Sequence, residues 1–142
     1  MRPIRLVVAA CSLALAALAA PVAAAAPSAT AQPADCQFKD PDFGPVGTVK
    51  CGSSPAYVLW ADNRFETFVL GADGVVYHEW QLSPGDKQGS GWYPLGSSNN
   101  VQYGVWKISN DPNAPVVMVQ GGDGRDYCDS WVDNGWTNWT LC

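Results

Sequence analysis

The stretch FETFVLGADGVVYHEW, residues 65–80, decides the fold. Two runs rich in aromatic and β-branched residues flank the turn Gly-Ala-Asp-Gly at 71–74. Phe65, Thr67 and Val69 alternate with polar and apolar neighbours, which is the period of a strand. The glycine of an Asp-Gly pair supplies the positive φ that a tight turn needs. The stretch therefore predicts a β-hairpin.

A second copy of this pattern follows at 115–131, PVVMVQGGDGRDYCDSW. The Asp-Gly pair and the tyrosine recur at a spacing of 50, and Trp80 recurs at 51 as Trp131, which predicts one extra residue and a bulge. Ser90-Gly91-Trp92 matches Thr137-Asn138-Trp139. A period near 50 indicates a duplicated β module over residues 56–142. We expect an all-β fold of two four-stranded antiparallel blade-like repeats, either a partial β-propeller or a sandwich, with disulfide bonds.

The N-terminal part of the chain has the layout of a secretory signal peptide. Arg2 and Arg5 precede an apolar run at 6–20, and small residues follow up to Ala31. Ala29-Thr30-Ala31 is a cleavage signal, and cleavage among residues 23–25 stays open. No other apolar run is long enough to cross a bilayer. We expect a signal peptide at 1–31, a secreted protein with no membrane segment after cleavage, and an N-terminal segment at 32–55.

Composition after removal of residues 1–31 excludes several classes. Six basic residues remain against 13 acidic ones, a net charge of −7, which argues against a nucleic-acid partner. Four cysteines remain and predict two disulfides. We favour Cys36 with Cys51 and Cys128 with Cys142, whereas a bond from Cys51 to Cys142 would join the chain ends. A single histidine and no C-x-x-C spacing predict no metal site and no cofactor.

Two segments, residues 63–81 and 90–96, share a further pattern: Arg64, Gly71-Ala72-Asp73-Gly74, Tyr77-His78-Glu79-Trp80 and Ser90-Gly91-Trp92. This pattern resembles one blade of a β-propeller lectin repeat. That repeat occurs in bacterial fucose-binding-type lectins and related fungal lectins. The second half keeps Asp123-Gly124, Tyr127 and three tryptophans, with Cys128 at the place of the histidine. The resemblance implies sugar sites between neighbouring blades. It implies ligand roles for Arg64, Glu79 and Trp92, and for Asp129 and Trp139 in the second half.

Two blades are too few for a closed propeller, which needs four to eight. The alternatives are a ring made from several chains, and thus a homo-oligomer, or one chain whose two blades pack as a sandwich. Trp80 and Trp131 are expected in the core because they lie on hairpin faces. Trp136 is a further candidate for ligand binding, because it follows a turn and its counterpart is Gly89.

The function expected from these features is binding of glycans or glycoconjugates without catalysis. Seven tryptophans provide aromatic surfaces on which sugar rings stack. His78 is expected to be a hydrogen-bonded structural residue, and no nucleophile elbow accompanies it. The alternative is a secreted protein-interaction module, such as an inhibitor or an adhesion factor.

Overall fold

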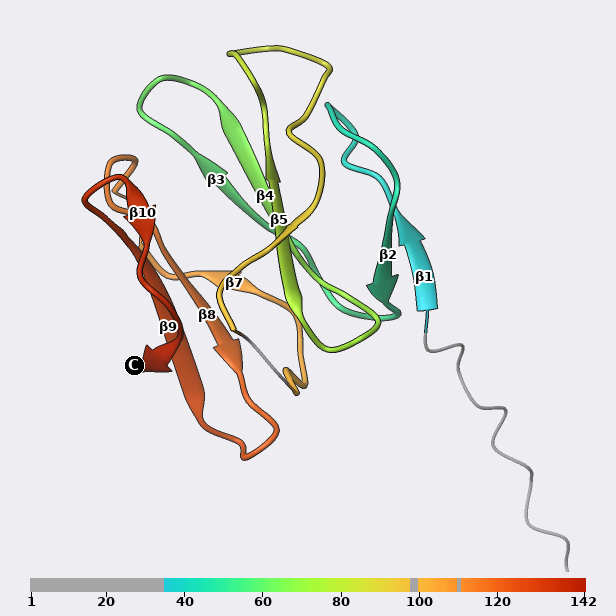
Figure 1. Cartoon of the computed structure of the whole chain (residues 1–142), viewed down its shortest axis with the longest axis vertical. Coiled ribbons are helices and arrows are strands. Elements are labelled where there is room, and N and C mark those ends of the chain that lie inside the picture. The colour runs from blue at the N-terminus through green and yellow to red at the C-terminus, as the bar shows by residue number, and fades with distance from the viewer. Residues whose placement is uncertain (1–34, 98–99, 110) are drawn as a thin grey trace, which may run out of the picture. The chain divides into compact units, whose positions relative to one another are not determined.

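In a computed structural model of the protein, the predicted hairpin forms the centre of a four-stranded antiparallel sheet, repeat 1 (Figure 1). Each strand of repeat 1 pairs with the next along the chain. The side chains of Glu66, Phe68 and Leu70 share one face, and those of Thr67 and Val69 share the other. Both faces of this strand are buried, so the sheet is an inner layer. Its strands are β3 (Ala56–Leu59), β4 (Phe65–Leu70), β5 (Val76–Trp80) and β6 (Tyr93–Pro94).

A second sheet, repeat 2, reproduces repeat 1 in its register. Glu66 pairs with Trp80 in repeat 1, and Val116 pairs with Ser130 in repeat 2. For every pair of the two central hairpins, the residue numbers in repeat 2 are those of repeat 1 plus 50. β10 and β11 both pair with β9. The prediction of two antiparallel blade-like repeats is therefore confirmed, and repeat 2 has a fifth short strand, β10, where repeat 1 has only the bridge of Gln81 with Gly89. The strands of repeat 2 are β7 (Trp106–Lys107), β8 (Val116–Gln120), β9 (Asp126–Val132), β10 (Gly135–Trp136) and β11 (Thr140–Leu141).

The two Asp-Gly corners have the same hydrogen bonds. The hydroxyl of Tyr77 donates to Asp73 Oδ2 over 2.9 Å, and that of Tyr127 donates to Asp123 Oδ2 over 3.0 Å. In each corner the other carboxylate oxygen accepts a backbone N–H two residues on, which is an Asx turn. Gly74 and Gly124 have φ of 80° and 78°. The turn chemistry predicted from the sequence is thus the same in both repeats.

The predicted bulge is wrong, and the correction moves Trp131 to the opposite face. The constant offset of 50 leaves no extra residue in the β8–β9 hairpin, so the counterpart of Trp80 is Ser130. The counterpart of Trp131 is Gln81, because Gln81 bridges to Gly89 as Trp131 pairs with Trp136. A shift of one residue in a strand turns a side chain to the other face of the sheet.

A two-stranded hairpin, β1 (Asp35–Phe38) with β2 (Gly47–Lys50), precedes repeat 1 and resembles the last two strands of a repeat. Cys36 pairs with Val49 and is bonded to Cys51, two residues further on. Cys128 pairs with Thr140 and is bonded to Cys142, again two residues further on. Both disulfides therefore join neighbouring antiparallel strands at equivalent places, and the favoured cysteine pairing is confirmed.

The β1–β2 hairpin and repeat 2 lie on opposite sides of repeat 1 (Figure 1). The two repeats pack head to tail, which means that one face of repeat 1 meets the opposite kind of face of repeat 2. Repeat 1 contributes Phe68 and Leu70 to the core, whereas repeat 2 contributes Val117 and Val119. Those valines are counterparts of Thr67 and Val69, so unlike faces of the two repeats meet. The other face of repeat 1 is covered by β2 and the loop after β1, where Thr67 donates to Asp40.

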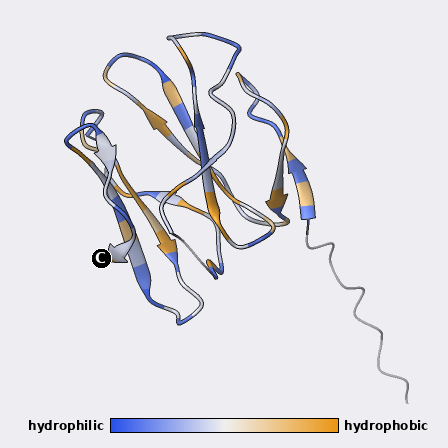
Figure 2. Ribbon diagram, in the orientation of Figure 1, coloured by the Kyte–Doolittle hydropathy of each residue, from blue (hydrophilic) through white to orange (hydrophobic). Residues whose placement is uncertain are grey.

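The outer face of repeat 2 carries few of the apolar residues that fill the core. The places of Phe68, Leu70, Val76 and Trp80 are taken there by Met118, Gln120, Asp126 and Ser130. Figure 2 colours most of β8 and the second half of β4 as hydrophobic, and these are the strands that contribute Phe68, Leu70, Val117 and Val119 to the core. A polar outer face is what the terminal unit of a repeat stack needs.

The structure describes residues 35–97, 100–109 and 111–142. The predicted signal peptide, residues 1–31, lies outside them. Across the described ranges the only regular elements are strands, and no helix there could span a membrane. Within residues 101–108 the strand pairing consists of the bridge of Val101 with Gly121 and of β7, and Gly104 between them packs against the backbone of Ser54.

Candidate functional site

A cleft of about 420 Å³ opens at one end of the interface between the two repeats, and we call it the indole cleft. Its walls come from the turn after β3, the ends of β4 and β5, the turn before β8 and the β9–β10 hairpin. The site therefore exists only where the repeats meet. The residues that line it are Trp60, Ala61, Asp62, Arg64, Glu66, His78, Trp80, Pro112, Asn113, Trp131, Asn134 and Trp136.

Three of the four indoles hold one another by edge-to-face contacts. The ring of Trp60 lies 5.0 Å from that of Trp131 and 6.3 Å from that of Trp136, with interplanar angles of 72° and 71°. Trp136 also meets Phe68 edge-on at 5.3 Å. Such contacts fix ring planes and are worth about 0.5–1.5 kcal/mol each beyond area burial. The fourth indole, Trp80, stacks on Tyr93 at 5.5 Å. The aromatic walls are thus positioned before any ligand arrives.

A buried carboxylate orients two of the cleft side chains. Glu66, 3% exposed, accepts the indole N–H of Trp60 over 2.8 Å and lies 2.5 Å from Nδ1 of His78. Because a carboxylate only accepts hydrogen bonds, Nδ1 carries the proton and Nε2 is left for another partner. The imidazole also contacts the rings of Phe68 and Trp80. The expectation of a hydrogen-bonded His78 is confirmed, and the ring lines the cleft as well.

Arg64 stands at the rim of the cleft in a fixed orientation. Its Nε donates to Asp62 Oδ2 over 2.6 Å, and its backbone N–H donates to Asp62 Oδ1 over 3.1 Å. The Arg64 hydrogen bonds keep the pKa of Asp62 below its ordinary value. Both side chains are partly exposed, so the pair contributes little to stability. It does hold a guanidinium with unused N–H groups beside the indoles.

The structure brings together only two of the six residues predicted to bind ligand. Arg64 and Trp136 both line the indole cleft. Trp92 and Trp139 line two other pockets, one at each Asp-Gly corner. Arg64, Trp92 and Trp139 each lie one residue before a strand, and the predicted tryptophans do not converge on one place.

Glu79 and Asp129 occupy equivalent positions in the two repeats and are both 0% exposed. Asp129 Oδ1 accepts from Thr137 Oγ1 and from the backbone N–H of Asn138, at 3.0 and 2.9 Å. Neither oxygen of Glu79 has a hydrogen-bond partner. Burial and, to a lesser extent, the nearby Asp40 raise the pKa of Glu79 to about 7. These carboxylates lie within the packed layers and do not line the indole cleft.

Sequence reasoning missed most residues of the cleft. Trp60, Glu66 and His78 were not proposed as ligand contacts, and Trp131 was expected in the core with Trp80. Both indoles are only partly buried, because they lie at an open edge of the interface. The alternation of Glu66 with Phe68 and of His78 with Trp80 was a usable signal, since it puts all four on one face of the sheet.

Comparison with known proteins leaves the family open: no family model matches the chain, and no curated protein matches it significantly. Within the described ranges, no group of three or more His, Cys, Asp or Glu residues could hold a metal ion. The two disulfides are consistent with an oxidising compartment. The arrangement in the cleft provides stacking surfaces, a guanidinium, an imidazole nitrogen and amides.

Proposed function

We propose that this protein is a secreted, lectin-like protein that binds neutral carbohydrate without catalysis, with the indole cleft as its sugar site. The observation that carries the proposal is the set of pre-positioned indoles with Arg64 and His78 around one opening. Small-molecule sites combine apolar and aromatic walls with a few placed polar groups, within volumes of roughly 300–1,000 Å³. A sugar ring presents both an apolar C–H face and hydroxyls, so it matches both parts of this lining.

The carboxylates of the cleft are engaged in ways that support binding rather than glycoside hydrolysis. Glycosidases use a pair of carboxylates facing each other across the bond that they break. Here Glu66 is bonded to Trp60 and His78, and Asp62 is bonded to Arg64. The residues lining the cleft include no serine, threonine or cysteine to act as a nucleophile. The lining therefore favours a ligand that is held and released unchanged.

The repeat architecture supports the comparison with propeller lectins. That comparison requires the two halves to be copies of one module, and the two Asp-Gly corners have the same hydrogen bonds and the same register. The disulfides and the signal-like leader support secretion. The partners that this proposal implies are glycans on a cell surface or on secreted glycoconjugates, bound in the indole cleft.

The experiment is titration of the disulfide-bonded protein with methyl glycosides of galactose, mannose, fucose and N-acetylglucosamine, followed by tryptophan fluorescence. We expect saturable quenching by at least one glycoside. Arg64→Met should weaken that binding about tenfold or more, because it removes a charged hydrogen-bond donor. Lys87→Met is the matched control, since Lys87 is exposed, 3.7 Å from Asp42, and outside the cleft.

Two results would count against this proposal. One is absence of binding across these glycosides and across a broad glycan array. The other is binding that Arg64→Met and Lys87→Met leave equally unchanged, which would place the sugar outside the indole cleft. Capture of a defined protein partner through the cleft in the absence of glycan would favour the protein-interaction alternative.

A further inference from the structure

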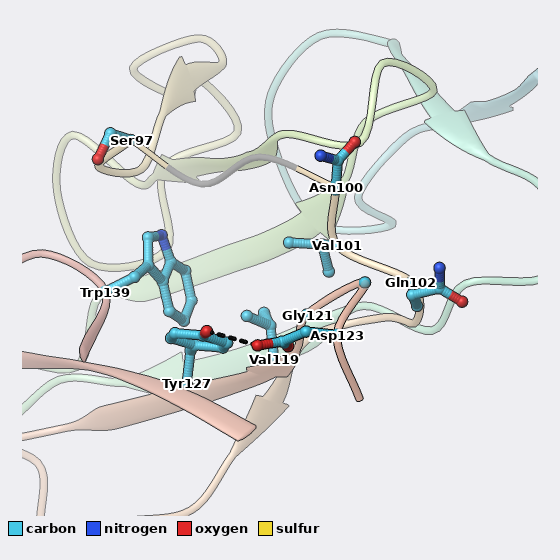
Figure 3. Close-up of a pocket in the computed structure, with 10 residues that line it drawn as sticks. Ser97, Asn100, Val101, Gln102, Val119, Gly121, Asp123, Tyr127 and Trp139 are labelled. Carbon is cyan, nitrogen blue, oxygen red and sulfur yellow. Dashed lines mark hydrogen bonds between the residues drawn. The ribbon is translucent and has the colours of Figure 1, made fainter. Parts of the chain in front are cut away.

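Two other pockets of the molecule are copies of each other, and we call them the corner pockets. The pocket of repeat 2 has a volume of about 600 Å³ and includes Val119, Gly122, Asp123, Tyr127 and Trp139 (Figure 3). The pocket of repeat 1 has a volume of about 370 Å³ and includes Val69, Ala72, Asp73, Tyr77 and Trp92. Each residue of the first set corresponds to one of the second by strand register or corner position.

The aromatic side chains of both pockets are fixed by hydrogen bonds at equivalent atoms. The indole N–H of Trp139 donates to Leu95 O over 2.9 Å, and that of Trp92 donates to Pro45 O over 3.2 Å. The phenol of Tyr127 lies beside the indole of Trp139 and points its hydroxyl at Asp123 (Figure 3). Because the indole N–H groups are already used, these rings offer a ligand their apolar faces and edges.

The polar groups shared by both pockets are acceptors. Each pocket has an aspartate carboxylate and the phenol oxygen bonded to it. Among the ion pairs of the described residues, one involves Asp73 or Asp123: the Nε of Arg125 lies 3.8 Å from the carboxylate of Asp123. A ligand must therefore supply hydroxyl or N–H donors together with an apolar ring face, and a carboxylate or sulfate on it would be repelled.

We propose that the corner pockets are a pair of equivalent sites, each binding one neutral sugar residue. The pair shares no lining residue with the indole cleft. The inference rests on the proposed function only for the ligand class, and it extends binding from one site to three. Several weak sites on one chain raise its avidity for clustered glycans.

The two pockets differ in their remaining walls, and this difference predicts unequal affinities. Ser97, Asn100 and Gln102 add hydroxyl and amide groups in repeat 2, whereas Gly47 and Thr48 take that side in repeat 1. The hydroxyl of Thr48 is already bonded to Gln37. The pocket of repeat 2 therefore offers more hydrogen-bonding groups, and we expect it to bind a given sugar more tightly.

The experiment follows the indole N–H signals of the ¹⁵N-labelled, disulfide-bonded protein by NMR during titration with the four methyl glycosides named above. Trp92→Phe and Trp139→Phe assign the two signals by their loss. We expect both signals to move saturably with the same glycoside, and neither to move with N-acetylneuraminic acid, which carries a carboxylate.

Matched aspartate variants separate the two sites. Asp123→Asn should weaken the response of Trp139 about tenfold or more and leave that of Trp92 unchanged, and Asp73→Asn should do the reverse. An asparagine oxygen can still accept the corner N–H, so the turn is kept. Asp126→Asn makes the same charge change at an exposed site outside both pockets and should alter neither response.

The outcomes distinguish this inference from the proposed function. Movement of the Trp92 and Trp139 signals with a silent Trp136 supports the corner pockets and overturns the indole cleft as the sugar site. Movement of Trp136 alone, with well-dispersed spectra, overturns the corner pockets. Corner signals that move but ignore both aspartate variants also overturn the inference, because the acceptors would then have no part in binding.

Discussion

Glu79→Gln should stabilise the protein at alkaline pH, because it removes a charge that the fold buries without a partner. The carboxylate is 0% exposed and neither oxygen is hydrogen-bonded. It is packed against two glycines: a Cβ on Gly44 would collide with it, and one on Gly89 would lie 3.0 Å from Oε2. Glutamine has nearly the same shape, so the substitution changes charge and leaves packing in place.

The magnitude follows from the pKa of Glu79, which is raised from 4.5 to about 7 by burial and by Asp40. The folded state disfavours the ionised carboxylate, so the unfolded state loses its proton first. Stability of the native protein should therefore fall as pH rises from about 4.5 to about 7, and stay low above that range. The difference between the two pKa values corresponds to about 3 kcal/mol in the free energy of unfolding at pH 8.

The assay is urea unfolding at pH 5 and at pH 8 with the disulfides intact. Glu79→Gln should gain about 3 kcal/mol over the native protein at pH 8 and ~1 kcal/mol or less at pH 5. Asp129→Asn, at the same place in repeat 2, should instead lose about 1 kcal/mol, because that carboxylate accepts two hydrogen bonds. A gain for Glu79→Gln that is equal at both pH values would refute the reasoning.

Three further predictions concern the packing. Phe68→Ala should lower the free energy of unfolding by about 3–5 kcal/mol, because Phe68 is fully buried between the layers. Met118→Ala, at the equivalent outer position of repeat 2, should lower it by ~1 kcal/mol or less. Equal losses in urea unfolding would contradict the head-to-tail packing. Gly124→Ala should cost about 1 kcal/mol because its φ is 78°, whereas Gly135→Ala, in open space, should be nearly neutral by the same assay. Light scattering of the native protein should give the mass of one chain, since the outer face of repeat 2 is largely polar; a mass of several chains would favour the ring.

The sequence predicted the local structure well, because hairpins depend on short-range chemistry. The Asp-Gly turns, the alternation along β4 and the spacing near 50 are all visible in the printed letters. The favoured cysteine pairing rested on the same short-range logic, whereas the sequence left a bond from Cys51 to Cys142 open and the structure decided between them. The head-to-tail stacking was not visible, because both faces of β4 carry apolar residues and the alternation does not say which layer each face meets.

The candidate site was predicted only in part. Arg64 was predicted from the resemblance and Trp136 from its position after a turn, and both line the indole cleft. Glu79 was named as well, but a strand position alone does not show that the loop after β1 covers it. Trp131 was misplaced because its spacing of 51 was interpreted as a bulge, although the strand register is unbroken.

The sequence by itself determined a duplicated, disulfide-bonded β module with two equal corners, because turns and strand alternation are set by neighbouring residues. The tertiary structure alone decided that Trp60 of repeat 1 meets Trp131 and Trp136 of repeat 2. It also decided that Glu79 is sealed from solvent while Arg64 is not. These outcomes depend on which faces of separate sheets dock, and a shift of one residue in one strand exchanges those faces.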